Sequence, residues 1–572
     1  MIDLIYFYFH TLFNYLIIYY LFYLSGRGFF LLLSKTYLRQ NFIQENILNI
    51  RSNILYPIVG LIITGNVLII LNFFLPLKSF FVYFVLFISI FPNVFHLNKL
   101  TFNNKFIFFV NYIFIPSVLL VSVSDINFHY DAGYYHLNHQ NWLRESKIIF
   151  GMTNIFWPFG MSSIYEYLSA VLWTQKSLIN IHYLSIIFIH FIYSFIFFNI
   201  FESKNTKLKN ASVLLLIFSI LDNFGVLGGR NGFIYIQEVT KQDTSLSILL
   251  IFTGLMIIYS LYINSFEKVD IITLSLFSLF IIQIKVSGVI IYYLLFIYFL
   301  TLITKNKIKL RTLIGLNTIP IFFGSIWLLK NYITSGCFIY PYTPSCKNNF
   351  RWFDAEDVAE VESYTSETSF AYMQFFQDKN LTFTNWLDYF FNQNGAFSEY
   401  YKAVYTNYLI SLTVILIFAF IFFKFQRPPL FITFVIFSYV LVLSTYLIFY
   451  GPIPRYTSGL LMTSIAALAF FKKKEKERFN LLNKIILTSL FVVSIGLLPR
   501  LNSYINFYNN KSVALYNPYQ VSNECIIDNN MNWYKPQEGD RCWIDLECRF
   551  EEDPIKFENL GSFKVAFKIS NK

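Results

Sequence analysis

The sequence is poor in charged residues. Asp, Glu, Lys and Arg make up 13% of its 572 residues, whereas hydrophobic residues make up 56%. Soluble globular proteins carry about 25% charged residues, so this composition excludes a string of soluble domains. Apolar runs of about 17 to 24 residues recur along the chain, and each is long enough to cross a hydrocarbon core roughly 30 Å thick as a helix. We therefore predict an all-α polytopic membrane protein.

The apolar runs predict about fourteen transmembrane helices. The count is good to about two, because window methods join closely spaced helices. They lie near residues 3–24, 54–75, 78–96, 104–123, 180–200, 211–229, 246–265, 270–284, 287–304, 313–330, 407–424, 430–450, 456–471 and 483–499.

The chain also lacks a concentrated basic patch. Its formal net charge is +11, but the basic residues are scattered over short loops between the apolar runs, which excludes a nucleic-acid footprint. Alternate loops are rich in Lys and Arg, namely those with Arg27, Lys35, Arg39 and Arg51, with Lys204, Lys207 and Lys209, with Lys305, Lys307, Lys309 and Arg311, and with Lys472, Lys473, Lys474, Lys476 and Arg478. By the positive-inside rule these loops face the cytoplasm. The loops 124–179, 230–245 and 331–406, the turn at 451–455 and the segment from about 500 are then exoplasmic, as are both termini.

Cysteine is scarce, and all five residues fall in segments assigned to the outside: Cys337, Cys346, Cys525, Cys542 and Cys548. An oxidising compartment such as a bacterial periplasm permits disulfides there. The nearest pairs are Cys337 with Cys346 and Cys542 with Cys548, but spacing alone leaves the connectivity open. We find no internal repeat, and residues 500–572 are predicted to form a small folded exoplasmic segment.

The first long outer loop contains the densest set of polar side chains. Asp131 is a candidate general base, because a partly desolvated carboxylate at a membrane boundary is suited to take up a proton. Asp125 is a weaker candidate that could instead cap the preceding helix. The loop is predicted to form two helices lying on the membrane, one from about Tyr134 and one over 161–175, joined by a turn at 151–160.

Histidines accompany Asp131 in this loop. His136 is predicted to orient the substrate or Asp131. Together with His129 and His139 it could instead form a zinc site with Asp131, but the loop has no cysteine and interfacial histidines usually form hydrogen bonds only. We therefore predict no metal site.

Later outer segments add complementary charges as candidate substrate-binding residues. The loop GGRNGFIYIQEVTKQD contains Arg230, Glu238, Lys241 and Asp243. Lys285 interrupts two apolar runs, which marks an ionisable residue as a functional candidate, although a snorkelling side chain is the alternative. Arg455 lies between two spans, where its guanidinium could bind a phosphate with two hydrogen bonds or simply lie at the interface.

Several of these motifs together resemble a known group of proteins. The run YDAGYYHL, followed by Trp142, Gly151, Asn154 and PFGMSS, is similar to the first loop of poorly characterised bacterial membrane proteins related to the GT-C glycosyltransferases. KNYITSGCFIYP at 330–341, GPIPRY at 451–456 and RCWIDLEC at 541–548 fit the same group in order. The resemblance implies a transferase that uses a polyprenyl-phosphate-linked sugar and a first outer loop with an aspartate base and two surface helices.

On this resemblance Asp131 would activate the acceptor hydroxyl. Asp243 or Glu238 would supply a second acidic contact, and Lys285 and Arg455 would neutralise the donor phosphate. GT-C enzymes usually carry this loop after the first span. Here about three additional spans come before the span that leads into the loop, so residues 1–100 are predicted to be appended helices on a core of 101–499. The loop has no DxD pair, so neither a divalent metal nor another cofactor is implied.

The expected function is therefore transfer of a sugar to a glycan or lipid acceptor at the exoplasmic face of a bacterial inner membrane. An O-antigen-type polymerase is an alternative, in which two arginine-containing outer loops carry the activity and Asp131 is dispensable. A transporter or flippase is a non-enzymatic alternative, which would favour charges inside the spans and inverted repeats. The predicted partners are the bilayer, the lipid-linked donor and the acceptor, with the oligomeric state left open.

Overall fold

The computed structural model describes most of the chain. The described residues are 2–37, 46–93, 105–126, 130–173, 178–224, 240–347, 350–369, 396–422, 426–450, 454–472, 481–497, 525–528, 533–536 and 555–568.

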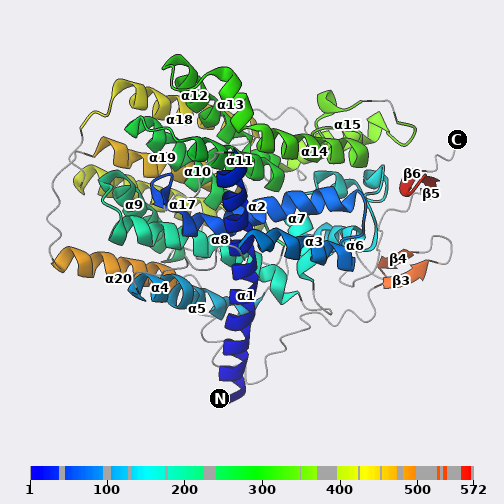
Figure 1. Cartoon of the computed structure of the whole chain (residues 1–572), viewed down its shortest axis with the longest axis horizontal. Helices are drawn as coiled ribbons and strands as arrows, with labels where there is room; N and C mark the ends of the chain where they lie inside the picture. Colours follow the sequence, from blue (N-terminus) through cyan, green and yellow to red (C-terminus); the bar gives the residue numbers. More distant parts are fainter. Residues whose placement is uncertain are drawn as a thin grey trace.

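Helices make up most of the described chain (Figure 1). Their bounds are α1 Ile2–Leu32, α2 Ser52–Asn72, α3 Phe80–Ile90, α4 Lys105–Phe109, α5 Ile115–Leu119, α6 Leu137–Glu145, α7 Ile164–Leu172, α8 Ile179–Phe197, α9 Thr206–Phe224, α10 Asp243–Ile263, α11 Lys268–Ile284, α12 Ile291–Thr304, α13 Leu310–Leu316, α14 Thr318–Ser335, α15 Ala355–Ser369, α17 Ala396–Phe422, α18 Leu430–Tyr450, α19 Pro454–Ala467 and α20 Leu481–Leu497. Short π and 3₁₀ turns extend or join several of them.

The strands form three antiparallel pairs: β1 (Asn46–Ile47) with β2 (Ile50–Arg51), β3 (Cys525–Asp528) with β4 (Trp533–Pro536), and β5 (Ile555–Leu560) with β6 (Phe563–Lys568). Figure 1 shows the last two pairs on the same side of the molecule as α6 and α15.

Six helical stretches of the described residues are long and apolar enough to cross a membrane: Tyr8–Thr36, Ser52–Asn72, Lys105–Val123, Ile179–Glu202, Asp243–Ile263 and Val286–Thr304. A seventh arises if α13 and α14, bent by 59° against each other, form one broken span. Every one of the fourteen predicted spans overlaps a helix of the structure. Several of those helices are shorter than a full span, so the count of fourteen stays a prediction.

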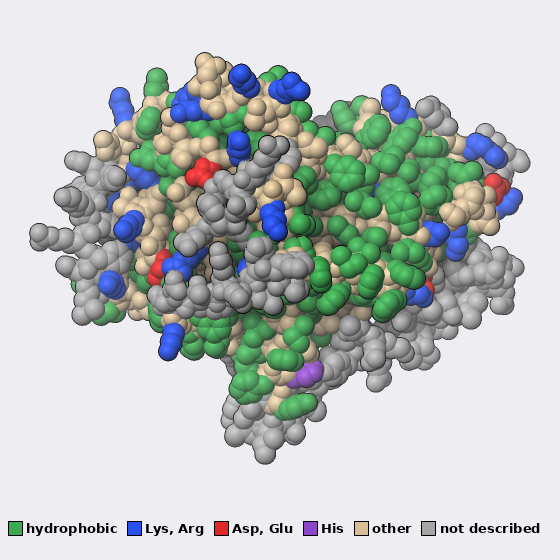
Figure 2. Space-filling model, in the orientation of Figure 1, with side chains coloured by type: hydrophobic (Ala, Val, Ile, Leu, Met, Phe, Trp, Pro, Cys, Tyr) green, Lys and Arg blue, Asp and Glu red, His purple; other side chains and the backbone are tan. Residues whose placement is uncertain are grey.

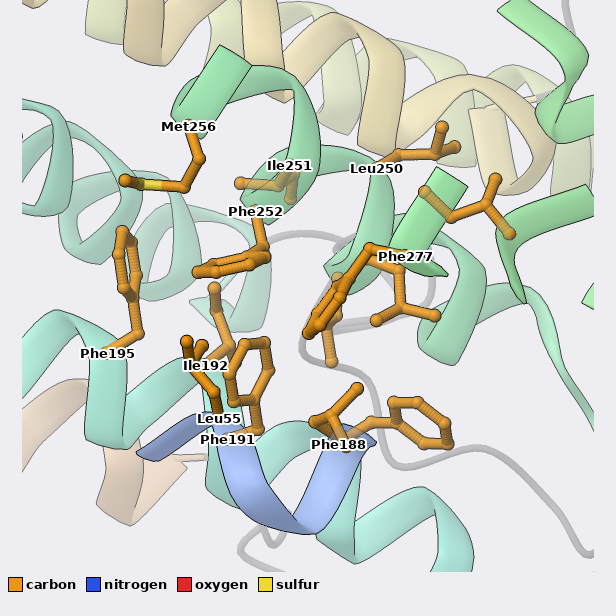
Figure 3. Close-up of a cluster of buried hydrophobic side chains, with 14 of the residues drawn as sticks. Leu55, Phe188, Phe191, Ile192, Phe195, Leu250, Ile251, Phe252, Met256 and Phe277 are labelled. Atoms are coloured by element: carbon orange, nitrogen blue, oxygen red, sulfur yellow. The ribbon is translucent and has the colours of Figure 1, made fainter. Parts of the chain in front are cut away.

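Most of the helices share one large hydrophobic core that includes residues of α1 and of α20. Figure 3 shows its centre, where side chains of α2, α8, α10 and α11 interlock. The rings of Phe191 and Phe252 meet edge to face with centroids 4.9 Å apart, and Phe252 lies 5.1 Å from Phe277. Leu55 of α2 reaches the same cluster. The predicted boundary at residue 100 therefore does not coincide with a break in this core.

Small residues let α1 and α2 approach closely. A methyl group on Gly26 would overlap the backbone oxygen of Tyr56, and one on Gly60 would overlap that of Phe22. Such contacts between glycines are a common way for membrane helices to associate, because lipid supplies no hydrophobic driving force between them.

One loop assignment is wrong. Arg27, predicted in a cytoplasmic loop, lies inside α1 and is buried, and its guanidinium donates a hydrogen bond of 3.1 Å to Asn93 Oδ1. The first helix continues because a paired arginine at a helix contact can be retained in an apolar helix.

The loops predicted to face the cytoplasm meet at one end of the bundle. Arg51 pairs with Glu202 at 3.1 Å, and Lys472 donates to Asn210 at 3.1 Å. Lys305 bonds to Asn264 at 3.3 Å. We call the end of the bundle with Arg51, Lys305 and Lys472 the basic end. Which compartment it faces stays a prediction.

The sides of the bundle carry many exposed apolar side chains, among them Phe87 of α3, Phe296 of α12 and Phe437 of α18. Figure 2 shows hydrophobic side chains covering much of the right half of the visible face, with basic side chains gathered mainly to the left and along the right edge. An apolar surface of this extent is a lipid or protein contact surface rather than a water-facing one.

The β5–β6 hairpin attaches to the first long loop at the opposite end. Phe150 N–H donates to the Lys564 carbonyl at 3.0 Å, and Ala566 N–H donates to the Phe150 carbonyl at 2.9 Å. The amide of Asn154 bridges the carbonyls of Trp352, at 2.8 Å, and Ala566, at 2.9 Å. A segment more than 400 residues further along the chain is thereby fixed to this loop.

Candidate functional site

Asp131 lies at the start of the helical segment that leads into α6. Its carboxylate forms an ion pair with the ammonium of Lys241. The Asp131 side chain is 26% exposed and that of Lys241 is 10% exposed. The loop from 124 and the loop before α10, which are 110 residues apart in sequence, therefore meet here.

Asp243 and Lys285 form a second ion pair next to the first. Lys285 Nζ donates to Asp243 Oδ1 at 2.7 Å. Asp243 begins α10, and Lys285 has extended backbone between the end of α11 and the following 3₁₀ turn. Because Lys241 and Asp243 are two residues apart, the two pairs lie close together. We call Asp131, Lys241, Asp243 and Lys285 the four-charge cluster.

Helix α19 brings the backbone of Arg455 to the same end of the bundle. The hydroxyls of Ser247 and Ser458 are 2.9 Å apart, and Thr463 Oγ1 donates to the Leu250 carbonyl at 3.3 Å. Both contact partners rise in number together, so α10 and α19 run in the same direction. Arg455 in the first turn of α19 therefore lies at the end where Asp243 begins α10. The side chain of Arg455 is outside the described part of the chain.

The side chains of two further predicted residues, Asp125 and Glu238, lie outside the described part of the chain. Asp125 ends a 3₁₀ turn over Leu120–Asp125, but its side chain lies outside the described residues. Glu238 lies in 225–239, which is also outside them.

His136 contacts Glu166 rather than Asp131. His136 Nδ1 is 2.8 Å from Glu166 Oε1, and His139 Nδ1 contacts Glu166 Oε2. All three side chains are buried. The carboxylate therefore occupies one nitrogen of each ring, and among the described residues no three His, Cys, Asp or Glu side chains are placed to hold a metal ion.

Burial raises the pKa of Glu166, but the charge of His139 and the hydrogen bonds from both histidines outweigh it and lower the pKa to about 2. The carboxylate is therefore ionised at neutral pH, and it holds α7 against the segment that carries Asp131.

Lys330 is a second buried ionisable residue near Glu166. Its Nζ lies over the rings of Tyr167 and Trp327, 5.8 and 5.7 Å from their centroids, and it has no hydrogen-bond acceptor among the described residues. A cavity of about 10 Å³ between His139 and Lys330 is about the size that one water molecule needs.

Sequence reasoning missed Glu166 and Lys330 as site residues. Both carried a signal that was used for Lys285, namely an ionisable residue within or at the end of an apolar run. Glu166 is the only charged residue of IYEYLSAVL, and Lys330 ends the run IFFGSIWLLK.

Cys337 and Cys346, one of the two nearest pairs whose connectivity the spacing left open, form a disulfide with an S–S distance of 1.99 Å. It closes the loop between α14 and α15. Cys542 and Cys548 lie in 537–554, outside the described residues.

Together, the apolar spans, the shared core and the charges gathered at the ends of the bundle define an α-helical integral membrane protein. A family model described as a domain of unknown function (DUF8201) matches residues 9–462. The chain belongs to this family, which includes the first helices as well as the segment up to α19. No curated protein and no solved structure matches the chain.

Proposed function

We propose that this protein is a membrane glycosyltransferase that moves a sugar from a polyprenyl-phosphate-linked donor to a glycan or lipid acceptor, with Asp131 as the general base. The observation that carries the proposal is the four-charge cluster, which combines a carboxylate that is open to solvent with cations held by other segments. The resemblance of the loop motifs to GT-C-related proteins supports the same reaction.

In this reaction the acceptor hydroxyl gives its proton to Asp131 while its oxygen bonds to the anomeric carbon of the donor sugar. The bond between that carbon and the phosphate oxygen breaks, and polyprenyl phosphate leaves with an additional negative charge. Lys285 and Arg455 would offset that charge, and such electrostatic stabilisation is usually the largest catalytic contribution. The ion pair with Lys241 holds Asp131 in place, which a positioned base requires.

The location that suits this chemistry is a bacterial inner membrane with the four-charge cluster on the exoplasmic side. The basic end then faces the cytoplasm. A lipid-linked donor also fits the apolar sides of the bundle, from which its polyprenyl chain could approach the cluster.

The experiment is analysis of lipid-linked sugars and surface glycans in a deletion strain complemented with wild type, Asp131→Asn or Glu356→Gln. Glu356 is an exposed carboxylate on α15 and serves as the matched control. We expect Asp131→Asn to lose 10²-fold or more of transfer, the usual contribution of a general base, while donor accumulates and Glu356→Gln behaves as wild type. Normal glycan from a stably inserted Asp131→Asn protein would refute the base assignment and favour the polymerase alternative.

A further inference from the structure

A pocket of about 300 Å³ opens at the end of the molecule that carries Asp131. Its walls come from three segments far apart in sequence: the first long loop, the disulfide-closed loop with α15, and strand β6. Its volume is at the lower limit for small-ligand sites and matches a ligand of roughly one or two sugar rings.

Aromatic rings make up much of the pocket lining, and these are Tyr134, Trp157, Tyr340, Trp352, Phe353 and Tyr364. Trp157 and Tyr364 meet edge to face with centroids 5.6 Å apart, so the first loop and α15 hold each other's rings in place. Flat apolar faces of fixed orientation suit the C–H faces of a sugar ring, and such rings bury large areas at low entropic cost.

The charged groups of the lining are largely acidic. Among the described residues, Asp354, Asp357 and Glu360 line the pocket together with one cation, Lys568, which donates to Asp357 at 2.5 Å. Carboxylates accept hydrogen bonds from hydroxyl or ammonium groups. The excess of negative charge disfavours an anionic ligand such as a phosphate or an acidic sugar.

The pocket and the proposed base are linked by one helical segment. Tyr134, which lines the pocket, follows Asp131 by three residues in the π-helical turn Ala132–His136. A glycan bound in the pocket would therefore contact the segment that carries the proposed base.

We propose that this pocket binds the acceptor and that the acceptor is a glycan without negative charge, either neutral or amine-bearing. The role of the bound glycan as acceptor rests on the proposed function, whereas the binding of a glycan in this pocket does not. It places the acceptor in the acidic aromatic pocket and leaves the cationic residues Lys285 and Arg455 to the donor phosphate.

The test is binding of the full-length protein, in labelled lipid nanodiscs, to an array of neutral, amine-bearing and acidic glycans. The variants are Trp157→Leu in the pocket and Tyr342→Leu as the matched control. Tyr342 is an exposed aromatic residue of the same disulfide-closed loop that does not line the pocket. Comparable thermal unfolding of the three proteins shows that each is folded.

We expect wild type and Tyr342→Leu to bind neutral or amine-bearing glycans and Trp157→Leu to bind them at least about tenfold more weakly, the loss expected for one aromatic contact. Absence of glycan binding by wild type, equal binding by Trp157→Leu, or a preference for acidic glycans would each overturn the pocket assignment. Glycan binding by a wild type that transfers no sugar would refute the transferase and leave the pocket standing. Sugar transfer by a wild type that binds no glycan at the pocket would refute the pocket assignment and leave the transferase standing.

Discussion

Glu166 is a buried charged residue to which two histidines bond, and the buried side chain of Lys330 lies nearby. Removing one partner of such a buried group leaves the others without compensation and is usually costly. The contacts of Glu166 therefore tie the first-loop helix α6 to α7, and Lys330 over the ring of Tyr167 joins α14 to α7.

The lowered pKa of Glu166 predicts how stability changes in acid. Its ordinary value of 4.5 applies to the unfolded chain, and the value of about 2 applies to the folded one. The ionised carboxylate therefore adds stability that is present above pH 4.5 and is lost as pH falls from 4.5 toward 2, with a total of about 3 kcal/mol.

We expect Glu166→Gln to be less stable than wild type at pH 7 and to lose less stability on acidification. Thermal unfolding in detergent at pH 7, 4.5 and 3 measures both effects. The exposed Glu356→Gln is the control, with wild-type behaviour at each pH. Parallel pH profiles for Glu166→Gln and wild type would contradict the assigned contacts.

The sequence predicted part of this residue-level picture. The spacing of His136 and His139 places both on one helix face, and both contact the same carboxylate. Their partner could not be predicted, because it lies about 30 residues away and the turn over 151–160 decides which face of α7 is presented. The pairing of Asp131 with Lys241 likewise depends on tertiary structure.

At the scale of helices, the contact between α1 and α2 depends on glycine. We expect Gly60→Ala to destabilise the protein by about 1–3 kcal/mol, the usual cost of overpacking, because the new methyl group would displace the backbone at Phe22. Thermal unfolding in detergent measures this loss.

Gly496→Ala in α20 is the matched control, because among the described residues no atom beyond its own helical backbone and chain neighbours lies within 4 Å of the added carbon. Alanine has the higher helix propensity, so this variant is expected to be neutral or slightly more stable. Equal stability of the two variants would mean that α1 and α2 are not in close contact at these glycines.

Hydropathy located the helices well, because the lengths of apolar runs reflect helices that must be buried in lipid or protein. It could not show that the first helix continues past Arg27, since that depends on Asn93. Nor could it show the 59° bend between α13 and α14, because both parts are similarly apolar.

At the scale of the whole molecule, the two ends of the bundle differ in charge, since one is the basic end and the other carries the four-charge cluster. A cytoplasmic reporter fused after Lys476 is expected to be active, whereas an enzyme that needs a periplasmic environment is expected to be active after Glu362. Fusions of both reporters at both positions provide the controls. The opposite pattern would invert the sidedness and place the four-charge cluster in the cytoplasm.

Charge bias thus predicted which loops share an end, and the hydrogen bonds at the basic end agree. It did not predict which residues of one end meet. The parallel run of α10 and α19 brings Arg455 to the end that carries Asp243, and that arrangement follows from helix packing between segments about 200 residues apart.

The docking of β5–β6 on the first long loop also sets an order of events during biosynthesis. Asn154 leaves the ribosome long before Ala566, its hydrogen-bond partner 412 residues later, and synthesis proceeds at roughly 5–20 residues per second. The loop must therefore wait tens of seconds for its final strand after it is made. Ribosome-stalled chains that stop before residue 555 would carry the inserted helices without β5–β6, so the first long loop would lack the hydrogen bonds to Lys564 and Ala566 and the pocket would lack Lys568.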